Sequence, residues 1–235
     1  INLSGLQFKN STSIDGGEGY NVVEVNTTTG AAEGGNTAAQ NSWSAFENID
    51  ELVVAGNNDT VQNVVTGNMT TLDGGRITVA TDGGDDTYLG ELRIDTDIVI
   101  SGKNQTLGAG NSNEGQTFGE VTVDVTRGIP DRNNVEVTLD NTARLNGELS
   151  VEQLNVISTS GTPGLSVLDL TSAGRRNTTN LVQDGVFTGV STVNLDGSQD
   201  LGLHISAMAA GNSVVDGSEL GGDLDLAMNA ALLNG

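Results

Sequence analysis

The chain contains the strand signal Asn48-Ile49-Asp50-Glu51-Leu52-Val53-Val54, followed by the turn signal Thr70-Thr71-Leu72-Asp73-Gly74-Gly75. A second copy of this two-part pattern runs from Ser150-Val151-Glu152-Gln153-Leu154-Asn155-Val156 to Thr192-Val193-Asn194-Leu195-Asp196-Gly197-Ser198. A recurring unit with apolar residues on short strands and Asp, Asn and Gly on the turns is typical of architectures that extend by repetition. The pattern favours a structural protein over an enzyme.

The composition is strongly acidic. The 235 residues include 31 Asp and Glu against 9 Lys and Arg, which gives a formal net charge of −22. Such a field repels nucleic acid and anionic lipid headgroups and attracts divalent cations. No stretch approaches the roughly 20 apolar residues that a membrane-spanning helix needs. We therefore expect no nucleic-acid partner and no membrane insertion, and we expect divalent cations to be attracted instead.

Other features of the composition also exclude common kinds of site. The chain has no Cys, so disulfides and thiolate metal sites are excluded. Only 3% of the residues are aromatic, so the core must come from Val, Leu and Ile, and an aromatic sugar-binding platform is not expected. The single histidine, His204, alternates with Leu203 and Ile205 like an outward strand residue. No nucleotide-binding or nucleophile motif is present, and we expect no enzymatic activity.

Strand signals dominate the chain. Apolar and polar residues alternate with period two, and each run ends at Gly, Asn or Asp. The clearest runs are residues 20–25, 76–79, 92–100, 120–125 and 135–139. Helix-tolerant composition is confined to residues 37–46 and 223–233. The sequence predicts an all-β fold, either a β-helix (β-solenoid) or β-sandwich modules, with short strands and turns rich in Gly, Asp and Asn.

The domain organisation is weakly marked. Gly-, Ala- and Asn-rich residues 30–41 separate an N-terminal strand pair from the first repeat copy, and residues 108–119 form a second polar segment. We predict an N-terminal β-rich domain over residues 1–145 and a β-strand-repeat domain over residues 146–235, with one continuous β architecture as the alternative. The first residue is Ile1, so we expect a processed product or a piece of a longer protein.

One glycine-rich segment resembles a calcium-binding repeat. Residues 16–24 fit the nonapeptide G-G-x-G-x-D-x-U-x, with Asn21 in place of the Asp. In such a turn the glycines allow the chain to close, and exposed carbonyls with a side-chain oxygen supply hard ligands. Asn21 is therefore a candidate metal ligand, and a glycine-rich turn without metal is the alternative.

Acidic turns supply the other candidate metal ligands. Asp82, Asp85 and Asp86 lie within five residues, where close carboxylates repel one another unless a counter-ion lies between them. The alternative is a solvated acidic turn. The same Asp-Gly loop chemistry recurs at three further candidate ligands: Asp196, Asp200 and Asp216.

The second half of the chain resembles the β-strand-repeat regions of RTX-type surface-layer proteins and large adhesins of Gram-negative bacteria. The resemblance rests on residues 190–203, with Val193-Asn194-Leu195-Asp196-Gly197-Ser198, and on residues 215–226, with Val215-Asp216-Gly217-Ser218-Glu219-Leu220. It implies β-rich modules, bound calcium, secretion and extracellular assembly. Tandem nonapeptides are missing, which is a departure from the family pattern.

Three functions remain open from the sequence. The first is an extracellular, cell-surface protein that self-assembles into a layer or filament, with calcium as stabilising cation. The second is a calcium-dependent adhesin module that binds cell-surface polysaccharide, and the third is a β-helical carbohydrate-active enzyme. Residues 1–8 alternate apolar and polar side chains, so we expect this segment to complete a neighbouring subunit's sheet by strand addition.

Overall fold

The computed structural model describes residues 14–26, 46–55, 62–65, 72, 74–80, 86–102, 116–142, 147–158, 164–176, 178–209 and 212–229. Seventeen strands lie within these residues. They are β1 (Ile14–Asp15), β2 (Val22–Asn26), β3 (Phe46–Glu47), β4 (Glu51–Ala55), β5 (Gln62–Val65), β6 (Arg76–Val79), β7 (Thr87–Arg93), β8 (Asp97–Ser101), β9 (Gln116–Arg127), β10 (Asn134–Asn141), β11 (Gly147–Ile157), β12 (Val167–Gly174), β13 (Thr178–Phe187), β14 (Thr192–Gly197), β15 (Asp200–Ala207), β16 (Val214–Leu220) and β17 (Leu224–Met228).

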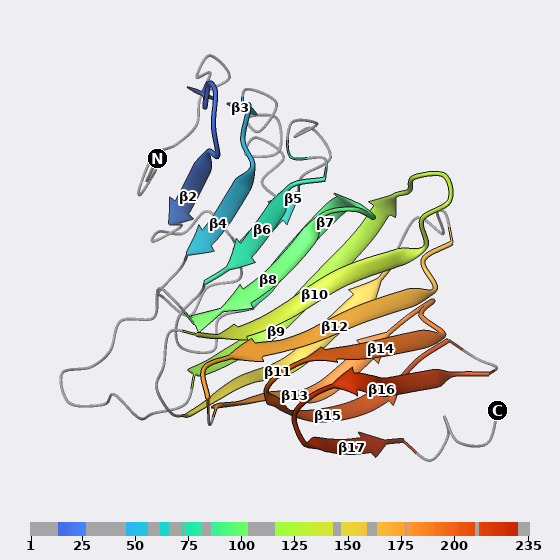
Figure 1. Ribbon diagram of the computed structural model, residues 1–235. Helices are drawn as coiled ribbons and strands as arrows, with labels where there is room; N and C mark the ends of the chain where they lie inside the picture. Colours follow the sequence, from blue (N-terminus) through green and yellow to red (C-terminus); the bar gives the residue numbers. More distant parts are fainter. Residues whose placement is uncertain are drawn as a thin grey trace.

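The strands wind into a two-sheet solenoid. The even-numbered strands from β2 to β16 form an eight-stranded sheet, and the odd-numbered strands from β5 to β17 form a seven-stranded sheet. Within each sheet every strand pairs in parallel with the strand two places further along the chain, so each turn of the coil contributes one strand to each sheet. Figure 1 shows the coils stacked from the N-terminal end at the top to the C-terminal end at the bottom. The predicted all-β fold is confirmed in its β-solenoid form.

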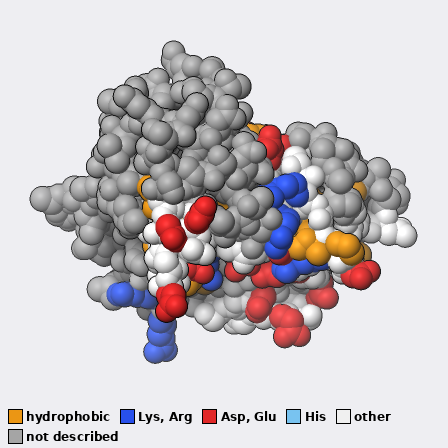
Figure 2. Space-filling model, turned by 90° about the horizontal axis from the view of Figure 1, so that it is seen from above, with side chains coloured by type: hydrophobic (Ala, Val, Ile, Leu, Met, Phe, Trp, Pro, Cys, Tyr) orange, Lys and Arg blue, Asp and Glu red, His pale blue; other side chains and the backbone are white. Residues whose placement is uncertain are grey.

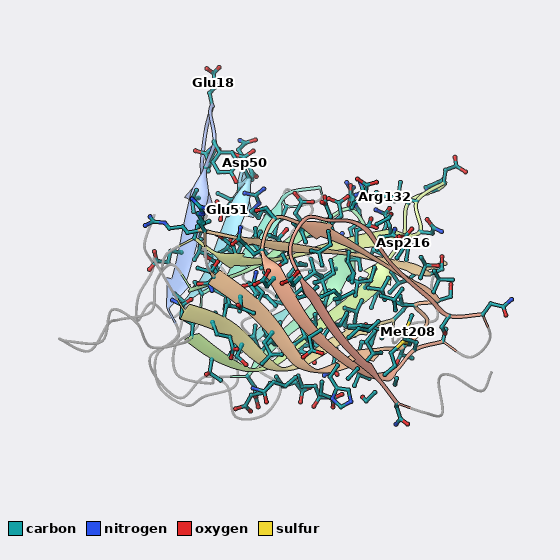
Figure 3. The ribbon with its side chains drawn as sticks, turned by 60° about the horizontal axis from the view of Figure 1, so that its bottom comes forward. Glu18, Asp50, Glu51, Arg132, Met208 and Asp216 are labelled. Carbon is teal, nitrogen blue, oxygen red and sulfur yellow. The ribbon has the colours of Figure 1, made fainter. Side chains whose placement is uncertain are left out.

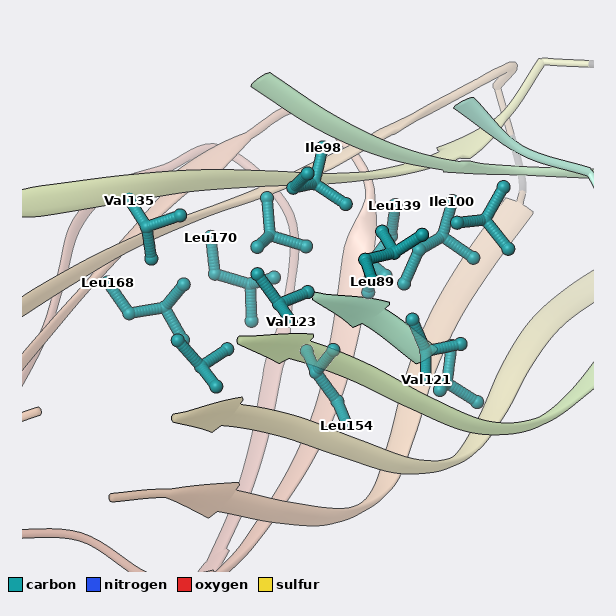
Figure 4. Packing of buried hydrophobic residues seen from close by; sticks show 14 of the residues in the cluster. Leu89, Ile98, Ile100, Val121, Val123, Val135, Leu139, Leu154, Leu168 and Leu170 are labelled. Atoms are coloured by element: carbon teal, nitrogen blue, oxygen red, sulfur yellow. The ribbon is translucent and has the colours of Figure 1, made fainter. Parts of the chain in front are cut away.

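The core lies between the two sheets and is built from rows of stacked apolar side chains. Ile98 pairs with Val137, Val137 with Leu170, and Leu170 with Leu195. All four side chains in this row are at most 1% exposed. Because neighbouring coils are in register, each inward residue lies on the equivalent residue of the previous coil, and Figure 4 shows this packing from both sheets. The core is aliphatic, with Phe118 and Phe187 as its largest buried side chains.

The odd-numbered sheet bends along its middle strands. Two consecutive residues between buried apolar positions interrupt the alternation at 152–153 in β11 and at 183–184 in β13. In β15 the alternation runs through residues 203–205 without interruption, and the pairing of β13 with β15 shifts its register there. The bend is therefore shared by the middle coils and ends before the C-terminal coils.

A buried polar cluster occupies the turn that joins the two sheets. Asn180 is fully buried, and its Nδ2 donates to the Ser172 Oγ at 2.9 Å, the Ala173 carbonyl at 2.9 Å and the Leu139 carbonyl at 3.2 Å. Asn141, also fully buried, donates to the carbonyl of Gly147 at 3.2 Å. These amides satisfy backbone acceptors where the chain leaves one sheet and enters the next.

Several expected elements differ in detail. Residues 92–100 are not one strand, because a turn separates β7 from β8, with the Thr96 N–H donating to the Arg93 carbonyl at 3.0 Å. Residues 223–233 have helix-tolerant composition, but β17 occupies residues 224–228. Its leucines pair with the leucines of β15, and this packing overrides the weak local preference.

The sequence repeat is not the structural repeat. In the first copy residues 48–54 lead into β4, and Gly74 and Gly75 form the turn before β6. In the second copy residues 150–156 lie in β11, and residues 192–197 are β14 itself. Both sheets contain strands from either side of residue 145.

Candidate functional site

The turn between β1 and β2 is closed by an amide at the position where a calcium-binding turn needs its cation. Asn21 Nδ2 donates to the carbonyls of Gly17, at 3.2 Å, and Gly19, at 3.0 Å. Gly17 and Gly19 have φ of 74° and 101°, which glycine adopts without strain. Figure 3 shows Glu18 at the tip of this projecting turn. The two carbonyls that would coordinate calcium already accept hydrogen bonds, so the turn as placed does not fit the ion.

Carboxylates at the base of the turn bind its backbone. Asp50 Oδ2 accepts the Asn21 N–H at 2.7 Å, and Asp15 Oδ1 accepts the Gly17 N–H at 2.9 Å and Asn48 Nδ2 at 2.7 Å. The hydrogen bonds from Asn48 and Gly17 hold the pKa of Asp15 below its usual value. The turn is thus closed by neutral donors on both sides.

The acidic cluster at residues 82–86 is described only in part. Asp82 and Asp85 lie outside the described residues. Asp86 is exposed, and its Oδ1 accepts the backbone N–H of Glu120 at 2.7 Å, which links the start of β7 to the bend in β9. Asp86 therefore has a structural partner from the next coil.

The three C-terminal candidates each bind a nearby backbone N–H. Asp196 accepts the Gly197 N–H at 2.5 Å, and Asp200 accepts the Asp223 N–H at 2.9 Å. Asp216 accepts the Ser218 N–H at 3.0 Å, and hydrogen bonds from the Ser218 backbone and side chain lower the pKa of Asp216. Asp196 and Asp216 lie on β14 and β16 of one sheet, whereas Asp200 begins β15 of the other. Within the described ranges, no group of three or more His, Asp or Glu side chains is arranged to hold a metal ion.

A polar network that sequence reasoning missed covers the outer face of the odd-numbered sheet. Glu120 Oε1 accepts hydrogen bonds from Asn155 Nδ2 at 2.7 Å and Thr122 Oγ1 at 2.9 Å. Gln153 Nε2 donates to Asn155 Oδ1 at 3.0 Å. Thr122 and Asn155 are 6% and 8% exposed although they point away from the core. The alternation of β9 and β11 could have placed these residues on one face, but not side by side, because the pairing partner of each strand was unknown.

Tyr88 joins this face through a buried carboxylate. Its hydroxyl donates to Asp124 Oδ2 at 2.7 Å, and Asp124 is 2% exposed. Burial of Tyr88 and its hydrogen bond to Asp124 raise the pKa of the phenol to about 12. Further along the sheet, His204 Nδ1 lies 3.0 Å from the Gln183 carbonyl oxygen and is exposed. Of these groups Glu120 and His204 are exposed, whereas Thr122, Asp124 and Asn155 are buried, so the network chiefly joins neighbouring coils.

The outer face of the even-numbered sheet carries a shorter ladder. Asp169 Oδ2 accepts Asn134 Nδ2, and its Oδ1 accepts Asn194 Nδ2, both at 2.7 Å. The carboxylate thus bridges three consecutive coils. Asp216 pairs with Asn194 in the next coil and extends the row to the C-terminal edge.

Arginines gather on the edge where odd-numbered strands lead into even-numbered ones. Arg93 pairs with Asp95, Arg132 with Glu136 at 2.6 Å, and Arg76 with Asp97 at 3.9 Å. Burial opposes ionisation of Asp95, but the hydrogen bond and charge of Arg93 outweigh it, so the pKa of Asp95 is lowered. Figure 2 shows basic and acidic side chains interleaved beside an apolar patch.

A shallow groove of about 650 Å³ lies at this edge, lined by residues 128–133 and Gly164. Ile129 and Pro130 supply apolar side chains to it, and Arg132 is already engaged by Glu136. The charged residues that line the groove are Arg132, which is paired with Glu136, and Asp131.

Comparisons with known proteins give no relative: no family model, no curated protein and no solved structure matches the chain. Among the described residues there is no helix with the length and apolar character to cross a membrane.

Proposed function

We propose that this chain is an extracellular structural protein that self-assembles into a surface layer or filament, and that divalent cations stabilise the assembly. The supporting observation is the repetitive, in-register stacking of parallel coils, an architecture that extends by adding equivalent layers. The outer faces of both sheets carry ladders of Asp, Glu and Asn, where condensed cations would reduce repulsion between molecules. The proposal assigns no catalytic activity to the chain.

The resemblance of residues 190–226 to RTX-type surface-layer proteins and adhesins supports the same location at the cell surface. Calcium in this proposal acts mainly between acidic faces. The described turns hold no preformed cage for it, because their Asp side chains and glycine carbonyls already have hydrogen-bond partners.

Electron microscopy of the purified protein tests the proposal. Samples at low ionic strength are imaged with calcium, with excess chelator, and with NaCl at the ionic strength of the calcium sample. Ordered sheets or fibres with calcium that disperse in chelator support the proposal. Dispersed particles under all three conditions would refute it.

A calcium-dependent adhesin is the second candidate, and the outer polar network of the odd-numbered sheet favours it. Exposed Glu120 and half-buried Gln153 and Tyr88 place polar groups on three neighbouring strands, as polysaccharide recognition requires. Pull-down on acidic and neutral polysaccharides, with wild type and with Gln153→Ala, distinguishes the two. Binding that requires calcium and is weakened by Gln153→Ala supports an adhesin.

A further inference from the structure

The buried polar cluster between the sheets has too few hydrogen-bond donors. We call this region the amide corner: it contains the side chains of Gln116, Asn141 and Asn180, each at most 1% exposed. Gln116 begins β9, Asn141 ends β10 and Asn180 lies near the start of β13, so the three amides belong to successive coils. The amide oxygen of each has no hydrogen-bond partner in the described part of the chain. Three buried acceptors therefore need a donor from another source.

The orientation of these amides is fixed by their neighbours. Gln116 Nε2 donates to the Gly102 carbonyl at 2.7 Å, and Asn141 Nδ2 donates to the Gly147 carbonyl at 3.2 Å. Asn180 Nδ2 likewise faces two backbone carbonyls. Exchanging nitrogen and oxygen in any of the three amides would bring two acceptors together without a hydrogen between them. The side-chain oxygens must therefore face away from these carbonyls.

The buried hydroxyls of the amide corner cannot supply the missing donors. Each hydroxyl carries one hydrogen. Ser172 Oγ donates to the Asp200 carbonyl at 3.2 Å, and Thr178 Oγ1 donates to the Arg175 carbonyl at 2.7 Å. Both hydrogens are thus directed at backbone acceptors, and the deficit of donors remains.

Glycines shape the amide corner for polar side chains. A Cβ on Gly102 would lie 1.2 Å from Gln116 Oε1, and a Cβ on Gly174 would lie 2.4 Å from Thr178 Oγ1. Gly174 is also the register partner of Asn141 in the next coil. Any larger residue at these glycines would displace a buried polar group, so the strand ends leave room for the amides in more than one coil.

We propose that the amide corner binds buried water molecules, which donate hydrogen bonds to the side-chain oxygens of Gln116, Asn141 and Asn180. Buried polar groups without a protein partner are usually paired with ordered water, which itself needs two or more polar partners. Asn141 Nδ2 also donates to the carbonyl of Thr179, the residue before Asn180, at 3.3 Å. The two asparagines are therefore neighbours in consecutive coils, and a water between them finds two acceptors for its two hydrogens.

A metal ion fits the amide corner less well than water. The three oxygens are neutral, whereas calcium takes roughly six to eight oxygen ligands, usually with carboxylates among them. The carboxylate of Asp140, next to Asn141, is already bound: its Oδ1 accepts the Thr142 N–H at 3.0 Å, and its Oδ2 accepts the Ser101 hydroxyl at 3.3 Å. An ion here would be a buried charge without a counter-charge, which is costly. The water site is separate from the acidic outer faces and does not depend on self-assembly.

High-resolution crystal structures of the wild-type protein, with calcium and with excess chelator, test the site directly. We expect a water oxygen at about 2.7–3.0 Å from each of the three amide oxygens under both conditions. A species present only with calcium, with several contacts of about 2.3–2.6 Å, would be an ion and would overturn the proposal. A dry corner whose amides have turned to protein donors would also overturn it.

Oxygen-17 relaxation dispersion provides a second test, because it counts long-lived water molecules in solution. Gln116→Met replaces the buried amide with an apolar side chain of similar length and should remove at least one long-lived water. The matched control is Gln183→Met, since Gln183 is exposed and its Nε2 donates to Ser150 Oγ at 2.8 Å. Circular dichroism and the melting transition verify that both variants fold.

Equal numbers of long-lived waters in wild type and folded Gln116→Met would contradict the proposal. An equal loss in Gln116→Met and Gln183→Met would place the long-lived waters outside the amide corner and would contradict it as well. The crystal structures need no variant, so they decide the question if Gln116→Met does not fold.

Discussion

The pair Tyr88 and Asp124 shows how single side chains on the outer face contribute to both stability and pH response. A phenol that donates to a buried carboxylate must stay protonated, because ionisation would place two negative charges 2.7 Å apart. The raised pKa of Tyr88, about 12, expresses this. The hydrogen bond between Tyr88 and Asp124 contributes its full stability below pH 10, the usual pKa of tyrosine in an unfolded chain. This contribution is lost as the pH rises through about 12.

Tyr88→Phe should lower the free energy of unfolding at neutral pH by about 1–3 kcal/mol, since Asp124 loses a donor. The variant should also lose less stability than wild type between pH 10 and 12. Denaturant unfolding across this range measures both effects. Tyr20→Phe is the comparison: Tyr20 is the only other tyrosine and is 63% exposed, and its hydroxyl donates to Glu51 Oε2 at 3.1 Å, so a smaller effect of the same sign is expected. Equal alkaline sensitivity of wild type and Tyr88→Phe would contradict the assignment.

Asn21 supports a second prediction at the residue scale. Asn21→Asp replaces the amide that donates to Gly17 and Gly19 with a carboxylate that cannot donate. In chelator the variant should be destabilised by about 1–3 kcal/mol. Calcium should restore part of this stability, because the new carboxylate and the two freed carbonyls supply some of the roughly six to eight oxygen ligands that calcium takes.

Thermal melts in chelator and in calcium measure the effect. Asn133→Asp is the comparison, since it adds the same charge and removes a single exposed hydrogen bond, from Asn133 Nδ2 to Ser166 Oγ, without a calcium-like turn beside it. An Asn21→Asp protein that melts like wild type in chelator would show that the amide does not close the turn.

Individual site residues were only partly predictable from the sequence. The glycine pattern identified the turn at residues 16–24. Whether a cation or the Asn21 amide closes that turn depends on where Asn21 Nδ2 points. With 31 acidic residues, no pair of carboxylates stands out, so Asp124 and Glu120 carried no signal. Their significance comes from the register between β7, β9 and β11, which brings together residues more than 30 positions apart.

At the scale of the coil, the turn between the sheets depends on buried amides. The Asn180 amide donates to three acceptors, two at the end of β12 and one in β10. Asn180→Ala should lower the free energy of unfolding by about 1–3 kcal/mol, because buried acceptors lose their donor. Thr179→Ala, at the neighbouring half-buried position, should have a much smaller effect.

Urea unfolding of the three proteins measures the difference. Similar midpoints for Asn180→Ala and Thr179→Ala would mean that the amide is dispensable. A change in the denaturant slope of Asn180→Ala would instead indicate that the coils no longer unfold together.

The strands themselves were well predicted, whereas their partners were not. The alternation at residues 76–79 and 135–139 corresponds to β6 and to the centre of β10. Period-two alternation identifies a buried face but not which strand lies alongside, so the parallel register could not be derived. The two copies of the sequence repeat fall on different parts of the coil, because Leu-Asp-Gly suits both the turn before a strand and the last residues of a strand. In the second copy Gly197 ends β14 and adopts a φ of 113°.

The whole molecule carries a charge of −22, which destabilises any compact state through self-repulsion. We expect the melting temperature at low ionic strength to rise on addition of calcium and to fall in excess chelator. Calcium should act more strongly than NaCl at the same ionic strength, because a divalent ion neutralises two carboxylates at once. Differential scanning calorimetry measures these shifts, and an unchanged melt in excess chelator at low salt would contradict the expectation.

Coils stacked by hydrogen bonds also have a mechanical consequence. Tension along the solenoid axis pulls on the strand ladders along the direction of their hydrogen bonds, so coils would open one after another from an end. Val193 and Val215 occupy equivalent positions in successive coils. The chain between them spans about 70–80 Å when extended, against a rise of about 4.8 Å per coil in the fold. Each opened coil would release more than ten times its folded length, and the molecule would yield to a load gradually instead of breaking at one point.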